Sequence, residues 1–352
     1  MQHNADYAVY SLKRDGNADW FPSANAAQKN NSSRNNRFIR NGENRMQTNR
    51  GQNPTAAVVV THNRIDLLRQ CVAQLENQTC ACDILIVDNA STDGTAQWLA
   101  SQPDLHWRNT GANLGGAGGF NLGMRWAVEA GYDYVWVMDD DTLPHPDALE
   151  KLLEADRILE GNYGWLSSVA LWTDGSECRM NRQKLNKRFY EFSPLLKYGL
   201  VQAEQATFVS LLLRSETIRQ FGLPIKEFFI WGDDIEFTRR IAVRGGLPCF
   251  MAGQSQVVHA TKSNVGSNVA LDDVERIGRY FYAFRNEVYL YRQEGMKGRI
   301  YCFAKRCRDF LRIIRYGKPK GPRFGILCKG IWAGFFFCPK VEHVRLHERA
   351  SL

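Results

Sequence analysis

The chain has 352 residues, 44% of them hydrophobic and 23% charged, which is enough for one large globular domain or two smaller ones. Its formal net charge of +8 indicates an anionic partner, either a membrane surface or a nucleic acid. The nine cysteines lack the spacing of a disulfide framework or a zinc knuckle, and we find neither an apolar leader nor a membrane-spanning apolar run, so we expect a cytosolic protein.

The first part of the chain in order is a polar leader followed by alternating strand-like and helix-like stretches. Residues 1–53 are rich in Asn, Gln, Ser and Arg and poor in large apolar side chains, which predicts a flexible segment. The runs typical of strands are 56–60, 83–88, 105–110 and 132–139. Helical spacing occurs at 64–78 and 91–101, and residues 115–131 read as a Gly-rich loop before a helix that Gly131 caps. Strands separated by helices predict an α/β fold with a mainly parallel central sheet flanked by helices.

The second half is less regular. Two strand-like runs, 164–172 and 206–214, enclose a polar, basic stretch. An apolar run, an acidic pair and a helix follow at 228–246, and a further strand ends at His259. Residues 276–293 have the pattern of an aromatic, basic helix.

Ligands bind beyond the carboxyl ends of the strands in sheets of this kind, and the polar stretches of the first half fall at these ends. They are Thr61-His62-Asn63-Arg64, Asp88-Asn89, the Gly-rich segment and Asp139-Asp140-Asp141. We therefore expect segments that are far apart in the sequence to line one crevice.

Asp139, Asp140 and Asp141 follow a buried strand and suit a hard divalent cation such as Mg²⁺ or Mn²⁺. Successive side chains at a strand end point to opposite sides, so Asp139 and Asp141 should share a side. An acidic turn before a helix is the alternative for this triplet. The Gly-rich segment could approach a diphosphate with its backbone N–H groups, or it could be a plain tight loop. Likewise, Asp88 could accept a hydrogen bond from a ribose hydroxyl or a base N–H, or it could cap the next helix.

The acidic pair Asp233 and Asp234 lies behind an aromatic wall. Burial and a second carboxylate both raise a carboxyl pKa, which suits a general base, although a capped helix start gives the same pattern. His259, at the end of an apolar strand, is by itself more typical of a structural residue than of a metal ligand, and it becomes a candidate ligand only beside other polar groups.

Taken together, these motifs resemble a family 2 inverting glycosyltransferase of the GT-A fold, over about residues 55–295. The segments that carry the resemblance are VVVTHNR, ILIVDNASTDGT, NLGGAGGFNLGM, VWVMDDD, FFIWGDDIEF, VVHATK and YFYAFRN, in this order. The Gly-rich form with a triple Asp is most similar to the galactofuranosyltransferase and rhamnosyltransferase branch.

The resemblance implies a role for each matched position. Residues implied to bind the nucleotide and the donor sugar are Thr61, Asn63, Arg64, Asp88, Asn113, Gly115, Gly116, Gly118, Gly119 and Asp140. Asp139, Asp141 and His259 match metal ligands for Mn²⁺ or Mg²⁺, and Trp231 matches the acceptor wall. Asp234 matches the catalytic base and Asp233 its neighbour. Because Gly232 separates Trp231 from the pair, the choice between the two acids stays open.

The activity implied is transfer of galactofuranose, rhamnose or a similar sugar from a UDP- or dTDP-sugar to a hydroxyl of a lipid-linked or cell-surface polysaccharide. Departure of the nucleoside diphosphate would be assisted by the metal, and a single displacement would invert the anomeric configuration. The alternatives are a sugar-phosphate nucleotidyltransferase and a nucleic-acid-binding protein. The first would need a basic Gly-rich signature at the first strand, and the second leaves the acids unexplained.

The C-terminal part, 296–352, is basic and amphipathic, and we expect it to follow a catalytic domain at 54–295. From Lys297 to Lys329 there are eleven Lys or Arg and one acid, Asp309. An apolar helical stripe runs through this region: Ile300, Phe303, Cys307, Phe310 and Ile314. This pattern favours peripheral binding to the anionic inner face of the cell membrane over binding to nucleic acid. A helix docked into the core with a solvated basic face is the alternative.

Overall fold

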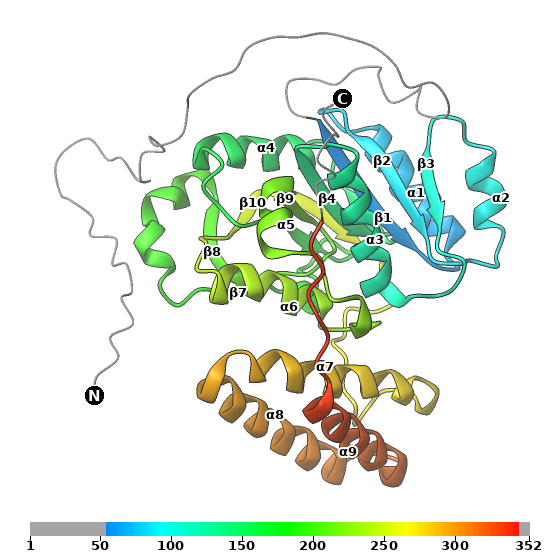
Figure 1. The fold of residues 1–352 in the computed structure, drawn as a ribbon, viewed down its shortest axis with the longest axis vertical. Coiled ribbons are helices and arrows are strands. Elements are labelled where there is room, and N and C mark those ends of the chain that lie inside the picture. Colours follow the sequence, from blue (N-terminus) through cyan, green and yellow to red (C-terminus); the bar gives the residue numbers. More distant parts are fainter. Residues whose placement is uncertain (1–53, 345–352) are drawn as a thin grey trace, which may run out of the picture. The chain divides into compact units, whose positions relative to one another are not determined.

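The structure, a computed structural model, describes residues 54–344, so the prediction of a flexible leader at 1–53 lies outside it. Within these residues, one ten-stranded sheet has the order β3-β2-β1-β4-β9-β6-β10-β8-β7, and β5 pairs with β10 (Figure 1). The strands are β1 (Thr55–Thr61), β2 (Asp83–Asp88), β3 (His106–Asn109), β4 (Tyr134–Asp139), β5 (Thr142–Pro144), β6 (Leu166–Leu171), β7 (Lys184–Leu185), β8 (Leu200–Gln205), β9 (Leu211–Arg214) and β10 (Phe250–His259). The α-helices are α1 (Ile65–Glu76), α2 (Thr95–Ala100), α3 (Gly115–Glu129), α4 (Ala148–Leu159), α5 (Ser215–Phe221), α6 (Asp233–Arg239), α7 (Tyr280–Arg292), α8 (Gly295–Tyr316) and α9 (Lys320–Phe336).

The first four strands along the chain are parallel, as the strand–helix alternation predicts. β1 pairs in parallel with β2 and β4, and β2 pairs in parallel with β3. Every residue of β1 is buried, because helices cover both faces of this part of the sheet. Val137 joins the core beneath α3, whereas the next residue, Met138, contacts Cys71 of α1 on the opposite face.

The prediction of a mainly parallel sheet is wrong for the second half, and the sheet is mixed. β9 lies between β4 and β6 and is antiparallel to both, and β8 is antiparallel to β10. Parallel neighbours need a long crossover, usually a helix. Between β6 and β9 the chain instead forms short strands and 3₁₀ turns, so the chain returns into the sheet in the opposite direction.

The Gly-rich segment is not a loop but the first turns of α3, so that prediction is corrected. A Cβ on Gly119 would lie 2.4 Å from Val60 Cγ1, and one on Gly123 would lie 2.3 Å from Val58 Cγ1. The glycines therefore allow α3 to lie directly on β1, a packing reason that outweighs their low helix propensity. The helix ends as predicted, at Gly131 with a φ of +84°.

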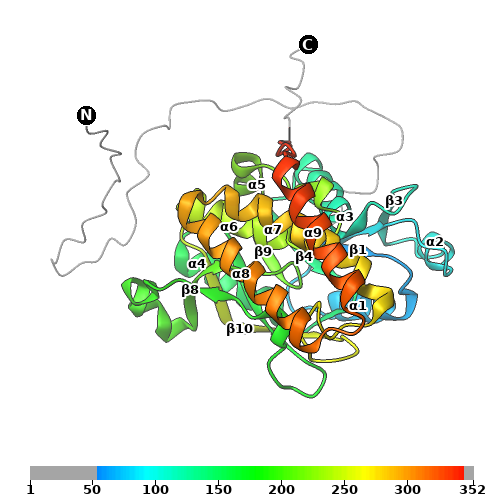
Figure 2. The ribbon, with the colours of Figure 1, turned by 90° about the horizontal axis from the view of Figure 1, so that it is seen from below.

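Three C-terminal helices form a layer beside the sheet domain. The predicted aromatic helix is α7, preceded by a 3₁₀ turn at Val274–Arg279. α8 and α9 pack on the side of α7 that faces away from the sheet, as Figures 1 and 2 show from two directions. Among the described residues, no helix combines the length and the apolar character needed to cross a bilayer.

Candidate active site

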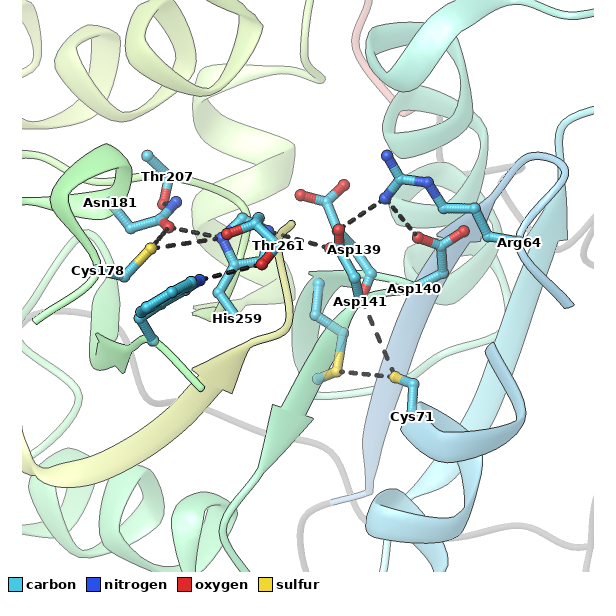
Figure 3. A network of polar contacts seen from close by, with 12 residues as sticks. Arg64, Cys71, Asp139, Asp140, Asp141, Cys178, Asn181, Thr207, His259 and Thr261 are labelled. Atoms are coloured by element: carbon cyan, nitrogen blue, oxygen red, sulfur yellow. Dashed lines mark hydrogen bonds and ion pairs between the residues drawn. The ribbon is translucent and has the colours of Figure 1, made fainter. Parts of the chain in front are cut away.

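Four strand ends meet at the carboxyl edge of the sheet and bring together residues that are far apart in the sequence. Thr61 ends β1, Asp88 ends β2, Asp139 ends β4 and His259 ends β10. The ends of β1, β4 and β10 lie around the acidic triplet Asp139-Asp140-Asp141. Figure 3 shows the acids, Arg64 and His259 converging from opposite sides of this edge.

Asp139, Asp141 and His259 form a group that could hold a metal ion. One ligand atom from each lies within 4.8 Å of the other two. The expectation that Asp139 and Asp141 share a side therefore holds geometrically. His259 reaches them because β5 pairs with β10 in a register that sets it opposite Thr142, the residue after Asp141. Two carboxylates and an imidazole are a donor set that suits Mn²⁺ or Mg²⁺. We call this group, with Asp140, the strand cluster.

The His259 ring is oriented by residues that the sequence did not single out. Its Nδ1 lies 2.7 Å from Asn181 Oδ1, and Asn181 Nδ2 donates to Thr207 Oγ1 at 3.0 Å. The Asn181 oxygen accepts a hydrogen bond from Nδ1. The other ring nitrogen, Nε2, then points toward Asp141 Oδ1, 3.0 Å away. Burial lowers the pKa of His259, but the hydrogen bond to Asp141 and nearby charges outweigh it and raise the pKa to about 10. Asn181 lies in the polar stretch after β6, where no pattern in the sequence pointed to it.

Arg64 supplies a positive charge to the strand cluster. Its Nη1 lies 2.6 Å from Asp141 Oδ2 and 3.3 Å from Asp140 Oδ1, and Thr61 Oγ1 donates to Asp140 Oδ2 at 2.7 Å. Burial raises the pKa of Asp140 to about 6 although Arg64 opposes this. Burial and the charge of Asp141 raise the pKa of Asp139 to about 7. Two buried carboxylates that resist joint ionisation mark a place where further positive charge is stabilising.

Asp88 and Asn63 hold the loops next to the strand cluster. Asp88 accepts from the Ser91 amide at 2.9 Å and from Asn109 Nδ2 at 2.6 Å, so it caps the turn after β2. Asn63 has a φ of +54°, and its Oδ1 accepts from the Thr92 amide at 2.7 Å. Asn63 thus connects the β1 and β2 loops, and Asp88 connects the β2 loop to the end of β3. Their predicted nucleotide contacts remain predictions.

The N-terminus of α3 lies at the same edge. Asn113 Oδ1 accepts from the Gly115 amide at 2.9 Å, and Asn89 Nδ2 donates to the Gly115 carbonyl at 2.9 Å. The glycines named for the donor diphosphate, Gly115, Gly116, Gly118 and Gly119, all lie in the first turns of this helix. A helix N-terminus attracts phosphate groups through its dipole and its free N–H groups. Here the Gly115 amide donates to Asn113, and the Ala117 amide donates to the Phe229 carbonyl at 3.2 Å, so the dipole is the main attraction.

Asp233 and Asp234, here called the turn pair, begin α6 after a strained turn. Phe229, Trp231 and Gly232 have φ values of +64°, +65° and +88°. Burial raises the pKa of Asp234 to about 6. Burial, Asp234 and Asp139 raise the pKa of Asp233 well above its ordinary value. Because the charge of Asp139 contributes to the raised pKa of Asp233, the turn pair lies near the strand cluster.

Asn286 of α7 holds this turn in place, and the sequence did not reveal it. Its buried Nδ2 group lies 3.0, 3.2 and 2.8 Å from the carbonyl oxygens of Phe228, Ile230 and Trp231. Trp231, the predicted acceptor wall, packs edge-on against Tyr280 with ring centroids 5.0 Å apart. The YFYAFRN segment therefore supports the turn that positions the acids.

Comparison with known proteins agrees with this arrangement. Residues 56–189 match the model of glycosyl transferase family 2. Over 74% of its length the chain is 28% identical to galactofuranosyltransferase GlfT1 of Mycolicibacterium smegmatis, and the match covers 95% of that protein. The chain is a family 2 glycosyltransferase. By sequence it belongs to the galactofuranosyltransferase branch, which confirms the resemblance.

Two further similarities are more limited. The undecaprenyl-phosphate mannosyltransferase of Micrococcus luteus is 39% identical, over 29% of this chain and 44% of that protein. The crystal structure of GalNAc-T7 with UDP, GalNAc and Mn²⁺ superposes with a TM-score of 0.50 at 11% identity. It covers 70% of this chain, which spans about half (52%) of that structure. At this identity the likeness concerns the fold, and the family 2 glycosyltransferase described here has a GT-A-like α/β fold with a mixed sheet.

Proposed function

We propose that this family 2 glycosyltransferase is a divalent-metal-dependent, inverting hexosyltransferase that uses a nucleotide-sugar donor. The observation that carries the proposal is the donor set of the strand cluster, with the turn pair near it. One group has the donor set for a cation, and the other has carboxyl groups with raised pKa values. Asp139, Asp141 and His259 would hold Mn²⁺ or Mg²⁺, which when bound would neutralise charge on the leaving diphosphate.

The donor would lie along the carboxyl edge of the sheet. Its diphosphate would face the N-terminus of α3, where the helix dipole favours anions. The guanidinium of Arg64 is half exposed and lies close enough to the acids to reach a phosphate as well. Asp88 and Asn63 fix the two loops between which a nucleoside would bind.

The residues of the turn pair would serve the acceptor. Asp234, ionised at neutral pH, would take the proton from the acceptor hydroxyl while that oxygen attacks the anomeric carbon. The bond from this carbon to the diphosphate oxygen breaks in the same step, so the configuration inverts and the nucleoside diphosphate leaves. The proton on Asp234 then passes to water. Trp231, beside the pair, offers an apolar face to the acceptor.

Galactofuranose in a UDP donor is the first sugar to test, because the relative that matches most of the chain is a galactofuranosyltransferase. The similarity to an undecaprenyl-phosphate mannosyltransferase supports an acceptor carried by, or close to, a membrane lipid. We therefore place the reaction at the inner face of the cell membrane, in the synthesis of a cell-envelope polysaccharide. A dTDP-sugar such as dTDP-rhamnose is the second donor to test.

A screen of nucleotide sugars tests the proposal. The protein is incubated with Mn²⁺ and UDP- or dTDP-sugars, with and without glycan acceptors, and released nucleoside diphosphate is measured. We expect one donor to stand out, EDTA to abolish release, and the product to have the inverted anomeric configuration by NMR. Release that persists in EDTA would overturn the metal role. Exchange of pyrophosphate into the nucleotide sugar would indicate a nucleotidyltransferase instead.

A further inference from the structure

The side of α8 that faces the protein is mixed, with Cys302 and Ile313 buried beside charged residues. Its buried positions include Arg306 and Asp309, which form an ion pair of 3.0 Å. Glu287 of α7 accepts from both Lys305 and Arg306. Because charged groups occupy much of this inner side, most large apolar side chains of α8 lie on the outside.

The apolar stripe predicted from the sequence is on this outer side. Ile300, Phe303, Cys307, Phe310 and Ile314 are all exposed, and Phe303 has 71% of its surface exposed. The alternative in which this stripe docks into the core is therefore excluded. Phe310 contacts Phe324 of α9 with ring centroids 4.9 Å apart, so the stripe continues onto the next helix.

The helix α9 presents its large side chains outward as well. Its inner side contains Gly330 and Gly334, where an added Cβ would lie 2.7 Å from Phe284 Cβ and 2.6 Å from Val288 Cβ. The small inner residues bring α9 close to α7. Trp332 and Phe336, by contrast, are 68% and 70% exposed and contact each other.

The same outer surface is strongly basic. Asp309 is the only acid from residue 295 to residue 336, and it is buried. Exposed cations flank the apolar side chains: Lys297, Arg299, Arg308, Arg312, Arg315 and Lys329. Exposed aromatic side chains flanked by cations are the pattern of a surface that lies in the headgroup region of an anionic bilayer.

We propose that the outer face of α8 and α9, defined by Ile300, Phe303, Leu311, Trp332, Phe335 and Phe336 with the flanking cations, docks on an anionic lipid bilayer. In the views of Figures 1 and 2 both helices lie on the side of α7 away from the sheet, so the face is free to meet a membrane. The turn pair lies across α7 from it, because Asn286 of that helix holds the turn. This assignment names the surface for the membrane location proposed above, but lipid binding is measurable without turnover.

The positive charge of this face argues against a second copy of the chain or the segment 1–53 as its occupant. A second copy of the chain would bring two basic faces together. The segment 1–53 contains eight Lys or Arg and four Asp or Glu, so it is itself basic. Both would be repelled. A nucleic acid matches the charge but offers no apolar phase for the exposed aliphatic and aromatic side chains.

Cosedimentation of the full chain with lipid vesicles tests the proposal. We expect binding to vesicles of equal parts phosphatidylglycerol and phosphatidylcholine, weakened by salt, and little binding to phosphatidylcholine alone. The double variant Phe303→Ser/Trp332→Ser should weaken binding at least tenfold, and Arg299→Gln/Arg312→Gln about tenfold. Exposed residues elsewhere provide matched controls: Leu185→Ser/Tyr190→Ser and Arg157→Gln/Lys187→Gln should bind like the wild type.

Transfer to a water-soluble acceptor should be unchanged in both docking variants, which separates this proposal from the proposed function. Equal binding of all variants to the anionic vesicles would overturn the docking surface. So would binding to duplex or single-stranded nucleic acid with no binding to vesicles. A stable dimer in sedimentation that the Phe303→Ser/Trp332→Ser change dissociates, without vesicle binding, would show that the face is an interface between copies.

Discussion

The strand cluster and the turn pair are both groups of buried acids, but their surroundings differ. The strand cluster has cationic and donor partners: Arg64 and Thr61 on one side, and His259, fixed by Asn181, on the other. The turn pair is held by backbone contacts, with Asn286 bonded to the preceding carbonyls. Burial raises the pKa of both carboxyl groups, and the charge of Asp234 raises that of Asp233 further.

This contrast shows how two neighbouring groups of the same residue type can suit two different tasks. In the strand cluster, despite burial, His259 and Arg64 keep the pKa of Asp141 low, while the raised pKa values of Asp139 and Asp140 mark a place where a bound cation is stabilising. Among the described residues the turn pair has no such cationic partners, and a carboxyl group with a pKa of about 6 has the property of a general base near neutral pH. Four predictions test this difference, from the largest expected effect to the smallest.

Removing the base should have the largest effect. Asp234→Asn should lower turnover about a thousandfold or more while Mn²⁺ and donor binding stay unchanged. It should also raise the melting temperature at neutral pH, because ionising a buried carboxyl whose pKa lies above its usual range disfavours folding. Steady-state kinetics, calorimetry and thermal unfolding measure the three effects. If Asp233→Asn stops turnover and Asp234→Asn does not, Asp233 is the base.

Removing the support of the turn should have the next largest effect. Asn286→Ala removes the side-chain donor to the Ile230 and Trp231 carbonyls, whereas the Phe228 carbonyl keeps the Ile230 amide and Arg285. The change should destabilise the protein by about 2 kcal/mol. It should also lower kcat roughly tenfold or more with little change in the donor KM, because the acids move and the donor site does not. Asn121→Ala is the matched control, since the buried Asn121 donates to the Pro224 carbonyl at 2.8 Å. A similar fall of kcat in both variants would make the role of Asn286 merely structural.

The pH dependence of the rate should report the turn pair. The pKa of Asp234 is raised to about 6 by burial, so kcat/KM should fall about tenfold per pH unit below that value and level off above it. The measurement is a rate profile at saturating Mn²⁺. An acidic limb with its midpoint near the ordinary carboxyl pKa of 3.8 would contradict the assignment.

The smallest effect concerns Arg64, which competes with a cation for Asp141. Arg64→Gln should tighten the binding of Mn²⁺ alone by about threefold, since a half-exposed ion pair contributes little, and should weaken binding of the nucleotide donor. Isothermal titration calorimetry with and without the nucleotide separates the two. Arg69→Gln, on the exposed side of α1, is the control. Weaker or unchanged Mn²⁺ binding in Arg64→Gln would refute the competition.

The sequence predicted well what depends on local pattern. The strand–helix rhythm predicted the parallel half of the sheet, and strand alternation predicted that Asp139 and Asp141 lie close together, although Asp141 belongs to the turn after β4. Both follow from periodicities that hold wherever the element lies.

What the sequence did not predict depends on tertiary neighbours. Asn181 acts on His259 from 78 residues away, and Asn286 acts on a turn more than fifty residues earlier. The glycines at the start of α3 read as a loop, because only the closeness of β1 reveals why a helix would contain them. An amphipathic pattern in α8 also does not state which side meets the protein. Buried ion pairs to Glu287 decide that, and they turn the apolar stripe outward.

The most direct test compares Mn²⁺ binding and sugar transfer in three proteins: the wild type, Asp141→Asn and Asp234→Asn. We predict that Asp141→Asn loses both binding and transfer, whereas Asp234→Asn binds Mn²⁺ like the wild type and transfers no sugar. Isothermal titration calorimetry and a coupled assay for released nucleoside diphosphate give the two readings. If Asp141→Asn binds Mn²⁺ normally, or if Asp234→Asn loses it, the division of tasks between the strand cluster and the turn pair is wrong.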